Sequence, residues 1–240
     1  MIVGPEKGAL ICQLIAERGP STMIELGGYV GYSSILFGDA VRKAGGRQFL
    51  SLEIDVRMAA VAKMLVDLAG LRDFVKILVA PSHESLVRLF KTEKTLSQVE
   101  IVFLDHWKER YVPDLLLLED LDVLKPEVSV LVADNVIFPG APDYLEWVRA
   151  TPIKKKALVQ RRKEKFAHLG DNEDRQATTA NGRGIYVNCL HGNPRLVYES
   201  SITEFEIDGG IKVCHLSIFF YILFLFYFSS PLFCDRVLSD

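Results

Sequence analysis

Cysteine is sparse in this sequence, and the few cysteines are widely separated. The four residues Cys12, Cys189, Cys214 and Cys234 include no pair at the spacing of metal-ligand motifs. We also expect no signal peptide at the amino terminus. These absences argue against a disulfide-stabilised secreted domain and against a zinc module. We expect free thiols in a cytoplasmic protein.

A strong excess of charge of one sign is also missing. The formal net charge is -3, whereas a nucleic-acid-binding surface requires a concentrated basic face. The basic cluster at 154–156 and 161–165 is soon diluted by acids, and we interpret it as a solvated segment. We therefore expect no nucleic-acid partner.

An ordinary membrane helix requires about 20 apolar residues. The uncharged apolar run at 216–228 has only 13. We weigh three interpretations of this run: a buried strand, a membrane-associating tail, and a gene-model error such as a translated intron. We favour the third, because nothing earlier in the chain prepares for such a run. We accordingly divide the chain into a domain at 1–215 and an atypical apolar tail at 216–240.

The sequence does contain a regular alternation of short apolar segments with longer amphipathic ones. The apolar segments are rich in Val, Ile and Leu, as expected when helices cover both faces of a parallel sheet. The pattern predicts an α/β fold with a doubly wound, mostly parallel sheet. The predicted strands are 22–26, 48–54, 75–80, 99–105 and 128–134, and the helices after them are 32–44, 56–70, 82–91, 113–122 and 142–149.

The alternation stops after this fifth strand–helix unit. Residues 151–183 are polar and charged, and we predict a long loop or insertion there. Residues 184–190 read as a further strand. Residues 197–207 and 211–216 could form a closing antiparallel pair.

A glycine-rich loop, with Gly27, Gly28 and Gly31, follows the first predicted strand. Glycine permits a tight turn and a close approach of a ligand to the backbone. The spacing matches neither a phosphate-binding loop nor the G-x-G-x-x-G dinucleotide motif, which disfavours a nicotinamide-dependent oxidoreductase. Taken alone, the loop is about as consistent with a purely structural turn.

Two acids accompany the loop. Glu25 directly precedes the glycines, where a carboxylate would repel a pyrophosphate but attract a cationic amino group. Glu53 ends the second predicted strand, a place suited to an acid that binds ribose hydroxyls. Together they favour a cationic nucleoside without phosphates, and S-adenosylmethionine fits that description.

Three oxygen-bearing side chains end the fourth and fifth predicted strands. Asp105 follows one strand, and Asp134 and Asn135 end the next. Carboxylate and amide oxygens are the ligands that Mg²⁺ prefers. Lys108 lies close behind, and a lysine beside a divalent cation could act as a base. Each residue has a simpler interpretation, since Asp105 could cap a helix, the Asp-Asn pair could form a turn, and Lys108 could be solvated.

Five segments of the sequence resemble the catechol O-methyltransferase family, in the family's order and spacing. They lie at 1–8, 24–34, 69–78, 102–119 and 131–149, and the stretches LDHWKERY and ADNVIFPGAPD are the most specific. The resemblance implies a class I, Rossmann-like methyltransferase fold with a seven-stranded sheet and a carboxyl-terminal antiparallel pair. It also implies a monomer that uses S-adenosylmethionine and Mg²⁺ to methylate one hydroxyl of a catechol.

The resemblance also implies roles for individual residues. Lys108 would be the catalytic base, and Asp105, Asp134 and Asn135 would bind the metal. Lys108, Asn135, Pro139 and Glu204 would contact the catechol, with Glu199 and Glu206 competing for the role of Glu204. The cofactor would be lined by Val3, Glu25, Gly27, Tyr29, Ser33, Glu53, Ile54, Ser82, His83, Asp105, His106 and Trp107.

The chain departs from the family at both ends of this resemblance. Helices that precede the segment matching Met1 in the family are absent, and residues 151–193 do not match. An alternative function follows from these departures: a catalytically impaired relative that binds the cofactor or a partner protein.

Overall fold

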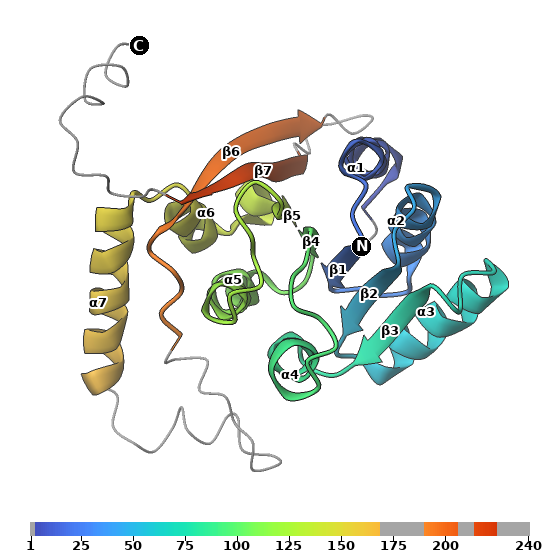
Figure 1. The fold of residues 1–240 in the computed structure, drawn as a ribbon, viewed down its shortest axis with the longest axis horizontal. Helices are drawn as coiled ribbons and strands as arrows, with labels where there is room; N and C mark the ends of the chain where they lie inside the picture. Colours follow the sequence, from blue (N-terminus) through green and yellow to red (C-terminus); the bar gives the residue numbers. More distant parts are fainter. Residues whose placement is uncertain (1–2, 169–189, 206–213, 225–240) are drawn as a thin grey trace.

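The computed structural model describes residues 3–168, 190–205 and 214–224. Strands and helices alternate from the amino terminus and build a sheet covered on both faces (Figure 1). The strands are β1 (Thr22–Leu26), β2 (Gln48–Glu53), β3 (Val75–Val79), β4 (Ile101–Leu104), β5 (Val130–Asp134), β6 (Leu196–Phe205) and β7 (Cys214–Phe224). The α-helices are α1 (Pro5–Arg18), α2 (Tyr32–Lys43), α3 (Val56–Leu68), α4 (Ser82–Val87), α5 (Tyr111–Asp120), α6 (Pro142–Val148) and α7 (Pro152–His168). Three short helical segments complete the described path: the π-helical η1 (Arg88–Thr92) and η3 (Val136–Gly140) and the 3₁₀-helical η2 (Lys108–Arg110).

The strand order of the sheet is β3-β2-β1-β4-β5-β7-β6. The first five strands are parallel, whereas β7 is antiparallel to both β5 and β6. The predicted parallel sheet with helices on both faces is therefore confirmed. The order reverses between β1 and β4, and ligands of such sheets bind beyond the carboxyl ends of the strands at that point.

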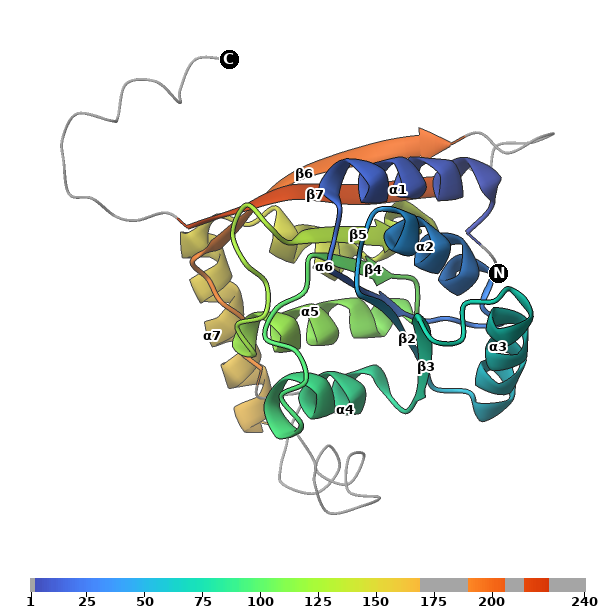
Figure 2. The ribbon, with the colours of Figure 1, turned by 45° about the vertical axis from the view of Figure 1, so that its right-hand side comes forward.

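The two faces of the sheet support two separate cores. Met23 and Phe103 face one core with α1, α2 and α3, whereas their neighbours Ile24 and Leu104 face the other with α4, α5 and α6. Figure 2 shows α1 and α2 on one side of the sheet and α4 and α5 on the other. This placement explains the uninterrupted apolar strands, because successive side chains point to opposite but equally buried faces.

Aromatic packing fixes α2 on the sheet. The rings of Phe37 and Phe103 meet edge to face with centroids 5.3 Å apart, and both side chains are fully buried. Burial of a phenylalanine stabilises a fold by about 1.5–3 kcal/mol, and such a ring pair adds roughly 0.5–1.5 kcal/mol. The start of α2, which follows the glycine loop, is thereby held against β4.

Residues 152–168 correct one prediction. We predicted a loop over 151–183, but Pro152–His168 forms α7. The helix is mostly polar, with a buried Lys155, and its weak apolar periodicity explains the wrong prediction. Residues 169–189, which contain nearly all of the predicted strand at 184–190, lie outside the described residues.

A buried polar cluster, formed by Glu119, Trp147, Lys155 and Tyr198, holds α7 against the core. One oxygen of Glu119 accepts hydrogen bonds from Trp147 Nε1, at 2.9 Å, and from the Tyr198 hydroxyl. The other oxygen accepts the backbone N–H of Asn193 at 2.7 Å. Lys155 Nζ donates to the Leu196 carbonyl at 2.7 Å and lies 4.3 Å from the centre of the Tyr198 ring. We call this group the Glu119 cluster.

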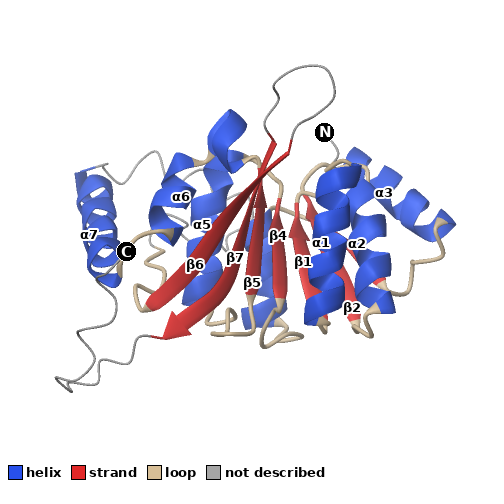
Figure 3. Ribbon diagram, turned by 90° about the horizontal axis from the view of Figure 1, so that it is seen from above, coloured by secondary structure: helices blue, strands red, loops and turns tan. Residues whose placement is uncertain are grey.

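The carboxyl-terminal strands differ from the prediction in their bounds. The expected pair at 197–207 and 211–216 is replaced by β6 and β7, and β7 runs on to Phe224. Figure 3 shows β7 between β5 and β6. The predicted boundary between residues 215 and 216 thus lies inside a strand, and residues 216–224 belong to the sheet. No helix in the described ranges is long and apolar enough to cross a membrane.

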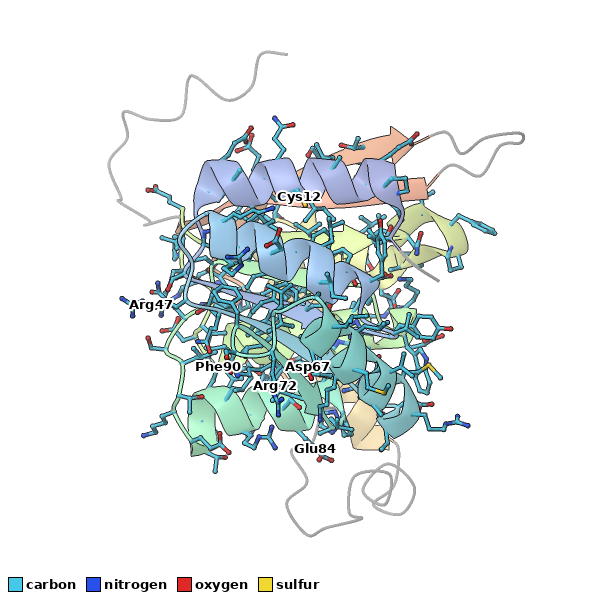
Figure 4. The ribbon with its side chains drawn as sticks, turned by 90° about the vertical axis from the view of Figure 1, so that its right-hand side faces the viewer. Cys12, Arg47, Asp67, Arg72, Glu84 and Phe90 are labelled. Carbon is cyan, nitrogen blue, oxygen red and sulfur yellow. The ribbon has the colours of Figure 1, made fainter. Side chains whose placement is uncertain are left out.

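Cys12 lies on α1 as a half-buried free thiol (Figure 4). Burial raises the pKa of this thiol, and the nearby Asp39 carboxylate acts in the same direction. The prediction of a free thiol is confirmed for Cys12. For the other three cysteines it stays a prediction, because their side chains are outside the described set.

Candidate active site

A pocket of about 680 Å³ opens at the carboxyl ends of the parallel strands, where the strand order reverses. The loops after β1, β2, β3, β4 and β5 all contribute to its wall. Within it lie fourteen of the residues singled out from the sequence: Gly27, Tyr29, Ser33, Glu53, Ile54, Ser82, His83, Asp105, His106, Trp107, Lys108, Asp134, Asn135 and Pro139. The fold therefore brings together residues that are far apart in the chain.

Glycine is required in the loop after β1 for reasons of space. Gly27 has a φ of +96°, and a Cβ there would lie 2.6 Å from the carbonyl oxygen of Asp105. A Cβ on Gly28 would lie 2.2 Å from Ser51 Oγ. Only glycine lets the loop lie this close to β2 and to the end of β4, so that the backbone itself forms the pocket wall.

Glu25 lies beneath this loop rather than in the pocket wall. It is fully buried, and its Oε2 accepts hydrogen bonds from Ser34 at 2.5 Å and Ser51 at 2.6 Å. Its Oε1 has no hydrogen-bond partner among the described residues. Burial raises the pKa of Glu25, and the serine hydrogen bonds only partly offset that effect. An unpaired carboxylate oxygen here is a place where a cationic group nearby would be stabilised.

Glu53 ends β2 and does line the pocket. Its Oε2 accepts the backbone N–H of Tyr29 at 2.7 Å, and its Oε1 accepts that of Asp55 at 2.8 Å. Each carboxylate oxygen can accept a second hydrogen bond. The side chain is therefore fixed in orientation and keeps acceptor capacity for ligand hydroxyls.

Asp114 organises the part of the pocket that follows β3 and β4. It accepts hydrogen bonds from Ser82, from His106 Nε2 at 2.8 Å and from Arg110 Nη2 at 3.1 Å. Arg110 Nη2 also lies 3.1 Å from His83 Nδ1. Although burial acts to raise the pKa of Asp114, His106, Arg110 and Ser82 together hold it below its ordinary value. Asp114 was not predicted as a site residue, because it lies inside the predicted helix at 113–122 and nothing else in the sequence marked it.

The two aspartates lie at neighbouring strand ends. The register pairs Leu104 of β4 with Ala133 of β5, so that Asp105 and Asp134 follow side by side. Burial, followed by the charge of Asp134, raises the pKa of Asp105 to about 7. A half-buried and a buried carboxylate that repel each other form a site that a cation would stabilise.

Lys7 of α1 is a further residue that the sequence reading missed. It is buried, and its Nζ donates to Asp134 Oδ2 at 2.5 Å. Asp134 Oδ1 accepts the backbone N–H of Asn135 at 2.7 Å. Lysines are rarely buried, and 127 positions separate this one from its partner, so nothing local in the sequence indicated the contact.

Lys108 lies on the wall of the pocket beside both aspartates. Its Nζ donates to the hydroxyl of Tyr111 at 2.5 Å and to the backbone carbonyl of Asp134 at 3.1 Å. Asp105 Oδ1 is 3.7 Å away. Burial lowers the pKa of Lys108, and the two carboxylates partly offset that effect. A lysine with a lowered pKa beside a pocket has the chemistry of a general base.

Residues 1–166 match the family model described as O-methyltransferase. The chain belongs to the O-methyltransferase family. Among solved structures, the O-methyltransferase TomG of Streptomyces achromogenes, in complex with S-adenosylmethionine, has a TM-score of 0.58 and 18% identity, covering 92% of this chain and 82% of that chain. The O-methyltransferase of Bacillus cereus, in complex with S-adenosylhomocysteine, has a TM-score of 0.55 and 16% identity, covering 91% and 82%. These likenesses support the methyltransferase fold.

Curated relatives in this family are more similar in sequence. Catechol O-methyltransferase of Bos taurus is 42% identical over 149 residues, covering 62% of this chain and 53% of the relative. The Sus scrofa protein of the same name is 42% identical over 149 residues, covering 62% and 78%. That of Mus musculus is 42% identical over 151 residues, covering 63% and 56%. The match thus spans little more than half the length of two of these relatives.

Three predicted site residues lie apart from the pocket wall or cannot be placed. Val3 is buried in the core beneath α1 and α2, and Glu25 lies behind the glycine loop. Glu204 is in β6, opposite His215 of β7, but its side chain is not among those described. Its competitor Glu199 is exposed on the same strand, and Glu206 is outside the described residues. The contact of a late glutamate with substrate stays a prediction.

Proposed function

We propose that this protein transfers a methyl group from S-adenosylmethionine to one hydroxyl of a catechol, with Mg²⁺ as a second cofactor. The observation that carries this proposal is the convergence of Asp105, Asp134, Asn135 and Lys108 on one side of the pocket. Two acids, an amide and a lysine at adjacent strand ends suit metal-assisted deprotonation of a hydroxyl better than they suit hydride or phosphoryl transfer.

The remainder of the pocket fits S-adenosylmethionine. Glu53 has acceptor capacity for ribose hydroxyls. The Gly27–Gly28 backbone forms part of the wall in a position where a Cβ would clash with Asp105 or Ser51. Glu25 lies behind the glycine loop, outside the pocket wall, so its contact with the positively charged methionine end stays a prediction from the family resemblance. The adenine base would be held by Ser82, His83, His106 and Trp107. When bound, this cofactor supplies an electrophilic methyl group on a sulfonium.

The donor set at the strand ends fits Mg²⁺. Among the described residues no three His, Cys, Asp or Glu side chains lie close enough together to hold a metal ion. A site here must therefore combine Asp105 and Asp134 with the amide oxygen of Asn135, and such hard oxygen donors suit Mg²⁺. When bound, Mg²⁺ supplies positive charge that favours ionised hydroxyl oxygens beside it.

In this proposal Lys108 removes the proton from the reacting hydroxyl. Its lowered pKa makes the neutral amine more accessible at neutral pH than in a solvated lysine. Pro139 would flank the catechol ring, and Asn135 would orient its oxygens. Holding the hydroxyl, the base and the methyl donor in one pocket supplies the positional part of catalysis. A cytoplasmic location and a monomeric state also stay predictions.

The direct test measures transfer of labelled methyl from S-adenosylmethionine to a simple catechol, with Mg²⁺ and with a chelator. We expect turnover that the chelator abolishes, and near-complete loss in Asp134→Ala. Turnover that persists in chelator would contradict the metal mechanism. Calorimetry with S-adenosylmethionine separates the alternative function, since cofactor binding without any methyl transfer would favour a catalytically impaired relative.

A further inference from the structure

Tyr111, the first residue of α5, lies directly behind Lys108. Its side chain is fully buried and is not part of the pocket wall. Its hydroxyl lies 2.5 Å from Lys108 Nζ, 2.7 Å from the carbonyl oxygen of Leu104 and 3.0 Å from that of Asp134. Neither the family resemblance nor the pocket assigns this residue a role.

The position of the Tyr111 hydroxyl is fixed by the same strands that carry the two aspartates. Its oxygen accepts a hydrogen bond from Lys108, and its single hydrogen is directed to the carbonyl of Leu104 or of Asp134. Those carbonyls end β4 and β5. The acceptor offered to Lys108 is therefore set by the sheet and cannot follow movements of the lysine.

Two close acceptors hold the amine of Lys108. The Tyr111 hydroxyl lies 2.5 Å from Lys108 Nζ, and the Asp134 carbonyl oxygen lies 3.1 Å from it. Lys108 lines the pocket and Tyr111 does not, so an effect of the Tyr111 hydroxyl on a ligand would pass through Lys108. Removing this hydroxyl would take away the closer of the two acceptors.

We propose that Tyr111 is a positioning residue that holds the amine of Lys108 in place at the pocket wall, where a substrate hydroxyl would lie. The inference rests on the proposed function, because it takes Lys108 as the base. In the step concerned, the O–H bond of the hydroxyl breaks, its electrons stay on oxygen, and a new N–H bond forms on Lys108. Tyr111 keeps its own proton throughout and touches neither substrate nor cofactor.

The test replaces Tyr111→Phe, which keeps the ring and removes the hydroxyl. We expect kcat to fall roughly 30-fold, because misplacing a reacting group by about 1 Å can cost on the order of 100-fold in rate. The KM for catechol and the Kd for S-adenosylmethionine, measured by calorimetry, should change less than about twofold, since the hydroxyl stabilises neither ligand. The matched control is Tyr198→Phe, which removes a buried hydroxyl of the Glu119 cluster outside the pocket. Its kcat should equal that of the unaltered protein.

A double-mutant cycle with Lys108→Ala identifies the route of the effect. If Tyr111 acts through Lys108, Tyr111→Phe should cause no further loss in the Lys108→Ala background. An equal loss in both backgrounds, an unchanged kcat in the single variant, or a matching rise in KM would overturn the inference. Full activity of Lys108→Ala would instead refute the proposed role of the lysine. Should Tyr111→Phe not fold, a difluorinated tyrosine at position 111 weakens the acceptor while keeping the hydroxyl, and an unchanged kcat there would equally overturn the inference.

Discussion

Two groups of charged residues in this molecule both combine acids with a lysine of low exposure, but their surroundings differ. In the Glu119 cluster, both oxygens of the acid and the amine of Lys155 have hydrogen-bond partners, and none of these residues lines the large pocket. At the strand ends, Asp105, Asp134 and Lys108 are also buried or half-buried, but they border a pocket of about 680 Å³. Burial lowers the lysine pKa in both groups. A shifted pKa therefore does not by itself distinguish a structural lysine from a catalytic one.

The largest expected effect separates the two lysines by activity. Lys108→Ala should lower kcat by about 10³- to 10⁴-fold, the upper part of the range for loss of a general base. The Kd for S-adenosylmethionine should change little, because the amine has no proposed contact with the cofactor. Methyl transfer and calorimetry on the same preparation give both numbers. Equal loss of turnover and cofactor binding would show that the lysine is structural.

The second prediction concerns stability and uses the acid of each group. Glu119→Ala should lower the free energy of unfolding by about 3–5 kcal/mol, because it leaves three donors without their acceptor and removes the negative charge near Lys155. The kcat of the protein that remains folded should be unchanged. Urea unfolding measured together with active-site titration tests this. A fall in kcat at full folding would contradict the purely structural role of the Glu119 cluster.

The third prediction uses Mg²⁺ to distinguish the two groups. Lys7→Met in the presence of a chelator should cost about 3–5 kcal/mol, since it leaves the buried Asp134 carboxylate without its cation. Mg²⁺ should restore part of this stability, because the proposed metal supplies positive charge at the same carboxylate. Glu119→Ala, the control, keeps Lys7 and the proposed site, so it should gain from Mg²⁺ only as much stability as the unaltered protein does, and less than Lys7→Met. Equal Mg²⁺ responses of both variants in thermal unfolding would argue against a metal site at Asp134.

The smallest expected effect is a pH dependence confined to Lys155. Burial lowers its pKa from an ordinary value of 10.5 to about 8, while Glu119 acts weakly in the opposite direction. Between these values the unfolded chain binds more protons than the folded one, so that stability from this group rises with pH. Relative to Lys155→Met, the unaltered protein should gain about 3 kcal/mol between pH 8 and 10.5. A constant difference between the two proteins across that range would contradict a buried lysine with a lowered pKa.

Local patterns in the sequence were sufficient to predict the repeated strand–helix units of the fold. The five parallel strands could be predicted because each is a short apolar run buried on both faces. Asp105 and Asp134 could be predicted to lie together because parallel strands end at one edge of the sheet. The roles of the catechol-contacting residues came instead from the family resemblance and stay predictions.

The missed features depend on contacts between distant residues. Lys7 and Lys155 were not recognised as buried, since lysine is ordinarily exposed and their partners lie on other elements. The helix α7 was missed because its apolar periodicity is weak and its buried side chain is a lysine. Glu25 was expected to face a ligand, but Ser34 and Ser51 hold it beneath the loop. The sequence pattern predicted the strand on which Glu25 lies, but it did not predict the direction of the Glu25 side chain.

The bond between Lys7 and Asp134 spans 127 positions. Contacts of such long range in sequence form slowly, because a long loop must close before they contribute stability. During synthesis α1 leaves the ribosome long before β5 exists. The half of the pocket that carries Lys108 and the aspartates can therefore be completed only after β5 has been made, more than a hundred residues after α1.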